Sequence, residues 1–131
     1  MQPLFEAIKC RFDTDPTLSG VVTGLYLNRA PQNTNFPYIV YFLVSGMGSN
    51  VFSGRSFDTH SIQFNIHSNN PSAVEVCTIY EYLINRFDNC SMNMTDYSTV
   101  QMKRDAFGLL EDEERFWLYF VTYSVIVQQK T

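Results

Sequence analysis

Cysteine and histidine are scarce in this sequence of 131 residues. The three cysteines, Cys10, Cys77 and Cys90, are odd in number and far apart, which favours free thiols in a reducing cytoplasm over a disulfide framework. The two histidines, His60 and His67, are seven positions apart, so on one strand they would point to opposite faces. A metal site needs three or four converging ligands, and nothing at ligand spacing accompanies either histidine. The sequence therefore predicts no metal site.

Long apolar segments are also missing. No run approaches the roughly 20 residues that a helix needs to cross a bilayer, and no basic segment followed by an apolar run begins the chain. We therefore expect neither a membrane span nor a signal peptide. The formal net charge of −4 is spread along the chain, which disfavours a non-specific grip on nucleic acid.

Motifs of familiar catalytic sites are absent as well. There is no Gly-x-Ser-x-Gly elbow and no P-loop, and Gly46-Met47-Gly48 lacks the third glycine of a dinucleotide fingerprint. The acidic residues 111–114 are adjacent on an expected turn, so no defined separation holds them as a catalytic pair. A small enzyme or ligand-binding domain that uses His60 or His67 stays open as an alternative.

What the sequence does contain is a clear strand followed by a helix. Residues 59–68 alternate, with Ile62, Phe64 and Ile66 on one face, which is typical of a half-buried strand. After a polar break, seven apolar residues recur at helical spacing, namely Ala73, Val76, Cys77, Tyr80, Leu83, Ile84 and Phe87.

Two starts are possible for this helix. In the first, Asn70 is the N-cap and Pro71 takes the first helical position. In the second, Ser72 is the N-cap and Glu75 completes a capping box.

The remaining elements follow from local patterns. They are a helix over 3–12, a turn near 17–24, a short strand over 24–27, a loop over 28–35, a strand over 38–45 covered on both faces, strands over 91–95 and 100–105, an exposed connection over 109–115 and a final strand, the longest, over 116–128. The expected fold class is α+β: one domain, 1–131, with a mainly antiparallel β-sheet and two α-helices packed on one face.

Residues 46–58, with three glycines and three serines, break every period and predict a long flexible loop. The loop is either a floppy hairpin tip or an arm that orders against a neighbouring subunit. The final strand is apolar on both faces, so we expect one face to meet the helices and the other to meet a partner.

Short elements along almost the whole chain resemble the tail-completion (tail-terminator) proteins of tailed bacteriophages. They are Asp15-Pro16-Thr17-Leu18, Ala30-Pro31-Gln32, Phe36-Pro37-Tyr38-Ile39-Val40, Ile62-Gln63-Phe64-Asn65-Ile66-His67-Ser68 and Ser72-Ala73-Val74-Glu75. The aromatic-rich end after Cys90 and the turn over 111–115 depart from the family's pattern.

The resemblance implies a structural, non-enzymatic virion protein without a cofactor. Such proteins form a homo-oligomeric ring, usually a hexamer, at the head-proximal end of the tail tube. The ring ends tube polymerisation and joins the tail to the head connector, while genomic DNA passes through its lumen without sequence-specific binding. The expected partners are thus further copies of the chain, the tail tube protein and the connector or head-closure protein; the expected location is the neck of the virion.

A ring requires two different surfaces on each subunit. The expected contact residues are Gly46, Met47, Gly48, Ser49, Asn50, Val51, Phe52, Arg55, Glu111, Asp112, Glu113, Glu114, Arg115, Trp117, Tyr119 and Tyr123. The alternative role of the same class is another neck or head-closure adaptor of the virion.

Overall fold

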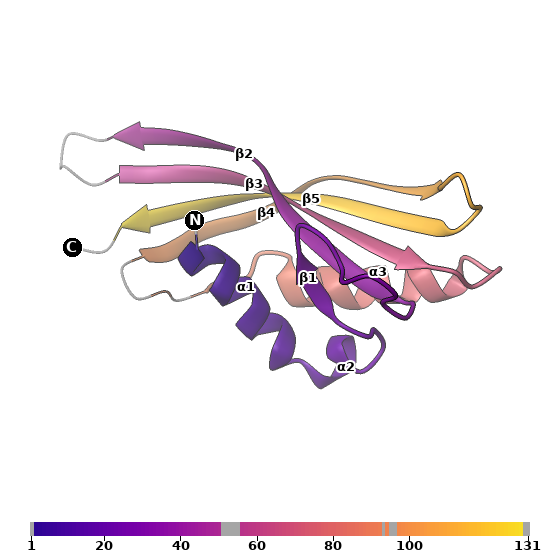
Figure 1. The fold of residues 1–131 in the computed structure, drawn as a ribbon. Coiled ribbons are helices and arrows are strands. Elements are labelled where there is room, and N and C mark those ends of the chain that lie inside the picture. The colour runs from indigo at the N-terminus through magenta and orange to yellow at the C-terminus, as the bar shows by residue number, and fades with distance from the viewer. Residues whose placement is uncertain (1, 51–55, 93, 95–96, 130–131) are drawn as a thin grey trace.

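A computed structural model describes residues 2–50, 56–92, 94 and 97–129 (Figure 1). Its elements are α1 (Gln2–Asp13), α2 (Pro16–Ser19), β1 (Leu25–Leu27), β2 (Tyr38–Asn50), β3 (Ser56–Ser68), α3 (Val74–Phe87), β4 (Tyr97–Glu111) and β5 (Trp117–Gln129). The five-stranded sheet has the order β1-β2-β3-β5-β4. β1 is parallel to β2, and the other neighbouring pairs are antiparallel.

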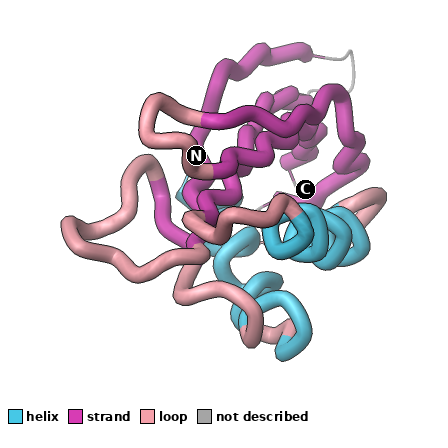
Figure 2. Tube along the Cα trace, turned by 90° about the vertical axis from the view of Figure 1, so that its right-hand side faces the viewer, coloured by secondary structure: helices cyan, strands magenta, loops and turns pink. Residues whose placement is uncertain are grey.

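The helices lie on one side of this sheet (Figures 1 and 2). On that side, the alternation in β3 gives Ile62, Phe64 and Ile66 no exposure to solvent. They pack in one core with residues such as Ile8 of α1 and Leu83 of α3. The predicted α+β class, with helices packed on one face of a mainly antiparallel sheet, is therefore confirmed.

The strand over 38–45 was expected to be covered on both faces, and this is wrong. Ile39 and Tyr41 point to the helices and are buried. No described helix lies over the opposite face (Figure 1), which we call the open face. Val40 is nevertheless only 7% exposed there, because it lines a hollow with loop residues such as Pro31 and Phe36.

The long loop expected over 46–58 is also largely absent. Residues 46–50 belong to β2 and residues 56–58 to β3, and the pairing continues from Gly46↔His60 to Asn50↔Ser56. Cross-strand hydrogen bonding overrides the weak strand propensity of glycine and serine here. Residues 51–55 of the expected loop lie outside the described residues.

Neither predicted start of the central helix is correct. α3 begins at Val74, and its N-cap, Ala73, makes no side-chain capping bond. Ser72 Oγ accepts a hydrogen bond from the N–H of Val74. The carboxylate of Glu75 accepts instead from the hydroxyl of the fully buried Ser68, at 2.7 Å. A buried hydroxyl needs a hydrogen-bond partner. Glu75, which was expected to complete the capping box, therefore bonds Ser68 at the end of β3.

The chain after α3 also differs from expectation. The described residues of 91–95 are not a strand, and Met92 and Met94 are buried. β4 is longer than predicted, with 15 residues against 13 in β5, and reaches Glu111. The longest strand is therefore β4 and not the final one.

Candidate interaction surfaces

The β2–β3 hairpin extends beyond the helices at one end of the sheet (Figure 1). β1 pairs with residues 39–41 alone, so the end of β2 has β3 as its one strand neighbour in the described structure. Five of the expected contact residues, Gly46 to Asn50, lie at this end of β2. The other three on this segment, Val51, Phe52 and Arg55, lie outside the described residues.

The acidic residues form the β4–β5 turn at the opposite end of the sheet (Figure 1). Asp112 Oδ1 accepts hydrogen bonds from the N–H groups of Glu114 and Phe116, both at 2.9 Å. Arg115 has a φ of 64° and donates its N–H to the Asp112 carbonyl. Residues 111–115 are all exposed, so the expectation of an exposed turn is confirmed for 112–115. The structure does not bring 46–50 and 111–115 together.

The aromatic residues expected at the exposed face of β5 point to the helices instead. Tyr123 has no exposure, so its assignment to an exposed contact surface is wrong. Tyr119 stacks on Tyr80 of α3 with ring centres 4.0 Å apart. Trp117 Nε1 donates to the Pro71 carbonyl at 3.3 Å. The reason is that α3 covers this face, which leaves the other face of β5 open.

A polar network surrounds Tyr123. Its hydroxyl donates to Asp88 Oδ1 at 2.6 Å, and Arg104 Nη2 lies 3.5 Å from Asp88 Oδ2. Arg104 Nη1 donates to the hydroxyl of Tyr80 at 2.7 Å. Burial, and then the hydrogen bond to Asp88, raise the pKa of Tyr123 above its ordinary value. The network joins α3, β4 and β5 through bonds among its own side chains, so we interpret it as structural.

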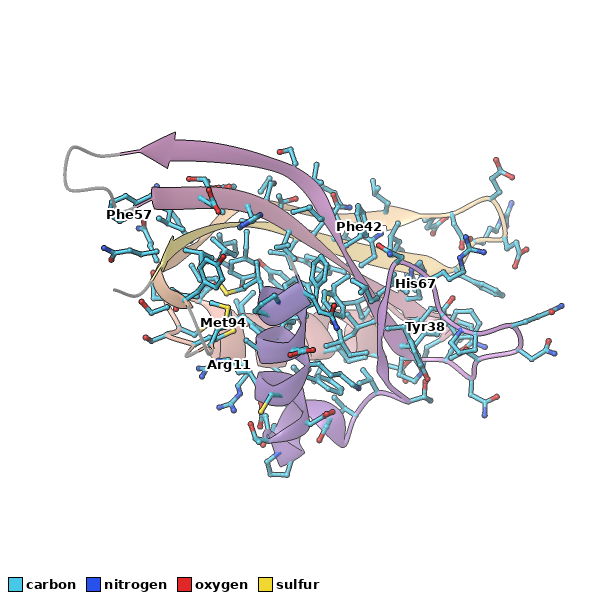
Figure 3. The ribbon with its side chains drawn as sticks, turned by 60° about the vertical axis from the view of Figure 1, so that its left-hand side comes forward. Arg11, Tyr38, Phe42, Phe57, His67 and Met94 are labelled. Atoms are coloured by element: carbon cyan, nitrogen blue, oxygen red, sulfur yellow. The ribbon has the colours of Figure 1, made fainter. Side chains whose placement is uncertain are left out.

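The two histidines lie on opposite faces, as predicted. His67 is on the open face and stacks on Tyr38, with ring centres 4.8 Å apart (Figure 3). His60 is paired between Gly46 and Val125 on the helix-covered face, and both its ring nitrogens are buried without a hydrogen-bond partner among the described residues. Burial lowers the pKa of each histidine. Within the described residues, no cluster of His, Cys, Asp or Glu could hold a metal ion.

Exposed apolar side chains gather at the two edges of the sheet, a feature that the sequence reasoning missed. Among the described residues, eight large apolar side chains are exposed. Leu27, Leu43 and Val44 lie at the β1–β2 edge and form what we call the β2 edge patch. Phe107, Leu109 and Leu110 lie at the other edge and form the β4 edge patch. The apolar run at 109–110 was a visible signal, but it was assigned to a connection.

A groove of about 720 Å³ adjoins the β2 edge patch. It runs between α1 and β1 and is lined by apolar side chains that include Phe5, Leu27 and Tyr41, with the exposed Cys10 at its side. Its polar lining comes from α1 residues such as Glu6 and Lys9. The groove is open, and polar side chains along it pair with one another on α1, as Lys9 does with Asp13 and Gln2 with Glu6.

No helix among the described residues is both long and apolar enough to span a membrane. The fold and its surfaces define an α+β protein with one helical layer, an open sheet face and two apolar sheet edges.

Neither a protein-family model nor a curated protein matches this sequence. A chain in the solved structure described as "Virion of native gene transfer agent (GTA) particle" is similar in fold, with a TM-score of 0.83. The two chains share 11% identity, and the alignment covers 97% of this chain and 96% of that one. The similarity thus includes the whole fold and not one motif.

Proposed function

We propose that this protein is a structural component of a phage-like virion. In this role it forms a homo-oligomeric ring, with six subunits the expected number, at the head-proximal end of the tail tube. The ring ends tube polymerisation and joins the tail to the head connector. The protein needs no catalytic site and no cofactor for this function.

The observation that carries the proposal is the similarity in fold, over nearly the whole of both chains, to a chain of a gene transfer agent virion. The order of short sequence elements that resembles tail-completion proteins supports the same assignment independently. The surfaces are also suited to assembly, since the chain exposes two separate apolar edges.

The positions of the predicted contact segments suit a joint between two structures. Residues 46–50 lie at one end of the sheet and residues 111–115 at the other (Figure 1). One subunit can therefore contact the tail tube at one end and the connector at the other. The net charge of −4 suits a conduit that does not grip passing DNA.

Electron microscopy of particles made with an early stop codon in this gene tests the proposal. We expect filled heads beside unattached, overlong tails. Tails of normal length beside leaking heads would instead move the protein to the head side of the joint. Complete, infectious particles would overturn the virion role.

A further inference from the structure

We infer that the two edges of the sheet are the two halves of one subunit–subunit interface. In this arrangement β4 of one copy adds to β2 of the next copy as an antiparallel neighbour, and the β4 edge patch packs on the β2 edge patch. The inference rests on the proposed ring and names the surfaces that build it.

The outer edge of β4 is unpaired along its second half. At 97–102 the segment after α3 covers this edge, through hydrogen bonds such as Asn89 N–H to the Met102 carbonyl at 2.9 Å and Thr99 N–H to the Met92 carbonyl at 3.2 Å. From 103 to 111 the strand pairs with β5 alone among the described residues. Unpaired strand edges readily accept another strand, and Phe107, Leu109 and Leu110 lie on this stretch.

The outer edge of β2 is unpaired in a similar way. β1 ends at Leu27, opposite Tyr41. From 42 to 50, β2 pairs with β3 alone among the described residues. Leu43 and Val44, which are 39% and 51% exposed, lie at the start of this stretch. Each edge therefore has a stretch without a strand partner among the described residues, beside exposed apolar side chains.

The strand directions favour a second copy as the occupant of both edges. Within one sheet β2 is antiparallel to β3, β3 to β5, and β5 to β4, so β2 and β4 run in opposite directions. In a ring whose strands run along its axis, rotation about that axis keeps these directions, so β4 of one copy meets β2 of the next as an antiparallel pair. Such a head-to-tail contact can close into a ring. One kind of contact satisfies both edges, whereas a two-fold β2–β2 or β4–β4 contact would leave the other edge of each copy unpaired.

The pleat of the strands limits the register to those in which residues of the same face lie opposite each other. Leu43 faces the helix side, because it pairs with Ile62, and Leu109 faces the same side, because it pairs with Tyr119. Cross-strand neighbours share a face, so Leu109 can lie opposite Leu43 of the next copy. Both strands carry an irregularity, between Leu43 and Ser45 and between Arg104 and Ala106.

This register also fits the limits of both edges. Leu110 then lies opposite Phe42 of the next copy. Both residues are on the open face, since Leu110 pairs with Leu118 and Phe42 pairs with Gln63 within their own subunits. The pairing ends there because β1 of the neighbour covers its Tyr41, and β4 itself ends at Glu111. At the other end, the contact of Asn89 with Met102 stops the pairing.

Site-directed cysteine crosslinking tests the inference. Leu43→Cys and Leu109→Cys are made separately in a Cys10→Ser background, which removes the exposed native thiol. Oxidation of their mixture with copper phenanthroline should give a disulfide-linked dimer, and neither variant alone should crosslink. A protein that carries both cysteines should give a ladder of oligomers, in purified form and inside assembled particles.

The matched control is Val21→Cys, an exposed apolar position outside both edge patches, mixed with Leu109→Cys. It should give no dimer. A homodimer of Leu109→Cys alone, or no ladder from the double variant in purified protein and in particles, would overturn the edge contact. Such a failure of the edge contact would leave the proposed function standing, provided that the stop codon still produces unjoined particles. Complete particles from the stop codon would instead reject the function itself.

Discussion

Tyr123 joins β5 to Asp88, the C-cap residue of α3, through its one side-chain polar atom. Its side chain is fully buried, and its hydroxyl donates to Asp88 at 2.6 Å. Tyr123→Phe keeps the ring but leaves one oxygen of a partly buried carboxylate without its donor. Hydrogen bonds to charged groups contribute about 1.5–3 kcal/mol, so we expect a loss of that size in the free energy of unfolding. Urea unfolding measures it.

The control for this change is Tyr82→Phe, since the Tyr82 hydroxyl makes no hydrogen bond to any described residue. It should alter the free energy of unfolding by less than about 0.5 kcal/mol. Equal effects from the two substitutions would show that the bond between Tyr123 and Asp88 contributes nothing.

His67 links stability to pH. Burial lowers the pKa of folded His67 below the value of about 6.5 expected in the unfolded chain, and Asp112 partly opposes this effect. Below that pH, unfolding is accompanied by protonation of His67. The stability that neutral, buried His67 gives the folded state is therefore fully present above about pH 6.5 and is lost as the pH falls.

We expect His67→Gln to flatten the fall in unfolding free energy between pH 7 and pH 5. The change in slope cannot exceed about 1.4 kcal/mol per pH unit, the limit for one proton. Urea unfolding at several pH values measures the slope. Asn65→Gln, on the same face and without a titratable group, should leave it unchanged, and an unaltered slope in His67→Gln would contradict the prediction.

At the scale of elements, α1 and α3 are joined by a reciprocal pair of arginines. Arg11 Nε donates to the carbonyl of Arg86 at 2.8 Å, and Arg86 Nε donates to the carbonyl of Arg11 at 2.9 Å. Arg86 Nη2 also reaches Thr14 Oγ1 at 2.8 Å. Each guanidinium thus satisfies a carbonyl in the last turn of the other helix, where positive charge is also favourable.

Arg86→Ala should lower the free energy of unfolding by about 1–2 kcal/mol, because two hydrogen bonds from a charged group are lost. Chemical denaturation gives the value. Lys9→Ala provides the comparison: Lys9 pairs with Asp13 at 3.3 Å, but both side chains are about half exposed, and such pairs contribute about 0–1 kcal/mol. If the two variants are equally stable, the arginine pair does not hold the helices together.

At the scale of the whole molecule, the two edges differ, and this difference gives a direct test of a head-to-tail ring. Leu43→Lys and Leu109→Lys each place a charge in one edge patch. We expect each variant alone to form no ring, because every contact would include one altered edge. Mixed, they retain one intact pair of edges and should form a dimer and nothing larger.

Analytical ultracentrifugation at high protein concentration, beside the unaltered protein, distinguishes these states. The monomer mass is 15.2 kDa, so a dimer is readily separated from a monomer. Val21→Lys should assemble like the unaltered protein. Rings formed by either edge variant alone would contradict the head-to-tail contact.

The local elements could be predicted because their signals are local. The alternation around Ile62, Phe64 and Ile66 specified a half-buried strand, and the stripe that ends at Phe87 specified an amphipathic helix. The same period predicted that His60 and His67 lie on opposite faces. Each of these follows from the periods of strand and helix, which neighbouring residues determine by themselves.

The candidate surfaces were less predictable, because they depend on which strands become neighbours. The sequence could not show that α3 would bury Tyr123, or that pairing would hold residues 46–50 in β2. Nor could it show that the end of β4 would be an edge, which turns Leu109 and Leu110 from connection residues into an apolar patch.

By itself, then, the sequence determined the half-buried strand before α3, the amphipathic character of α3, the opposite faces of the two histidines and the α+β class. The tertiary structure alone decided the sheet order, the two free edges and the network around Tyr123. The physical reason is that hydrogen bonds between strands and contacts between layers join residues far apart in the chain. Their strength depends on the partner and not on the local residue types.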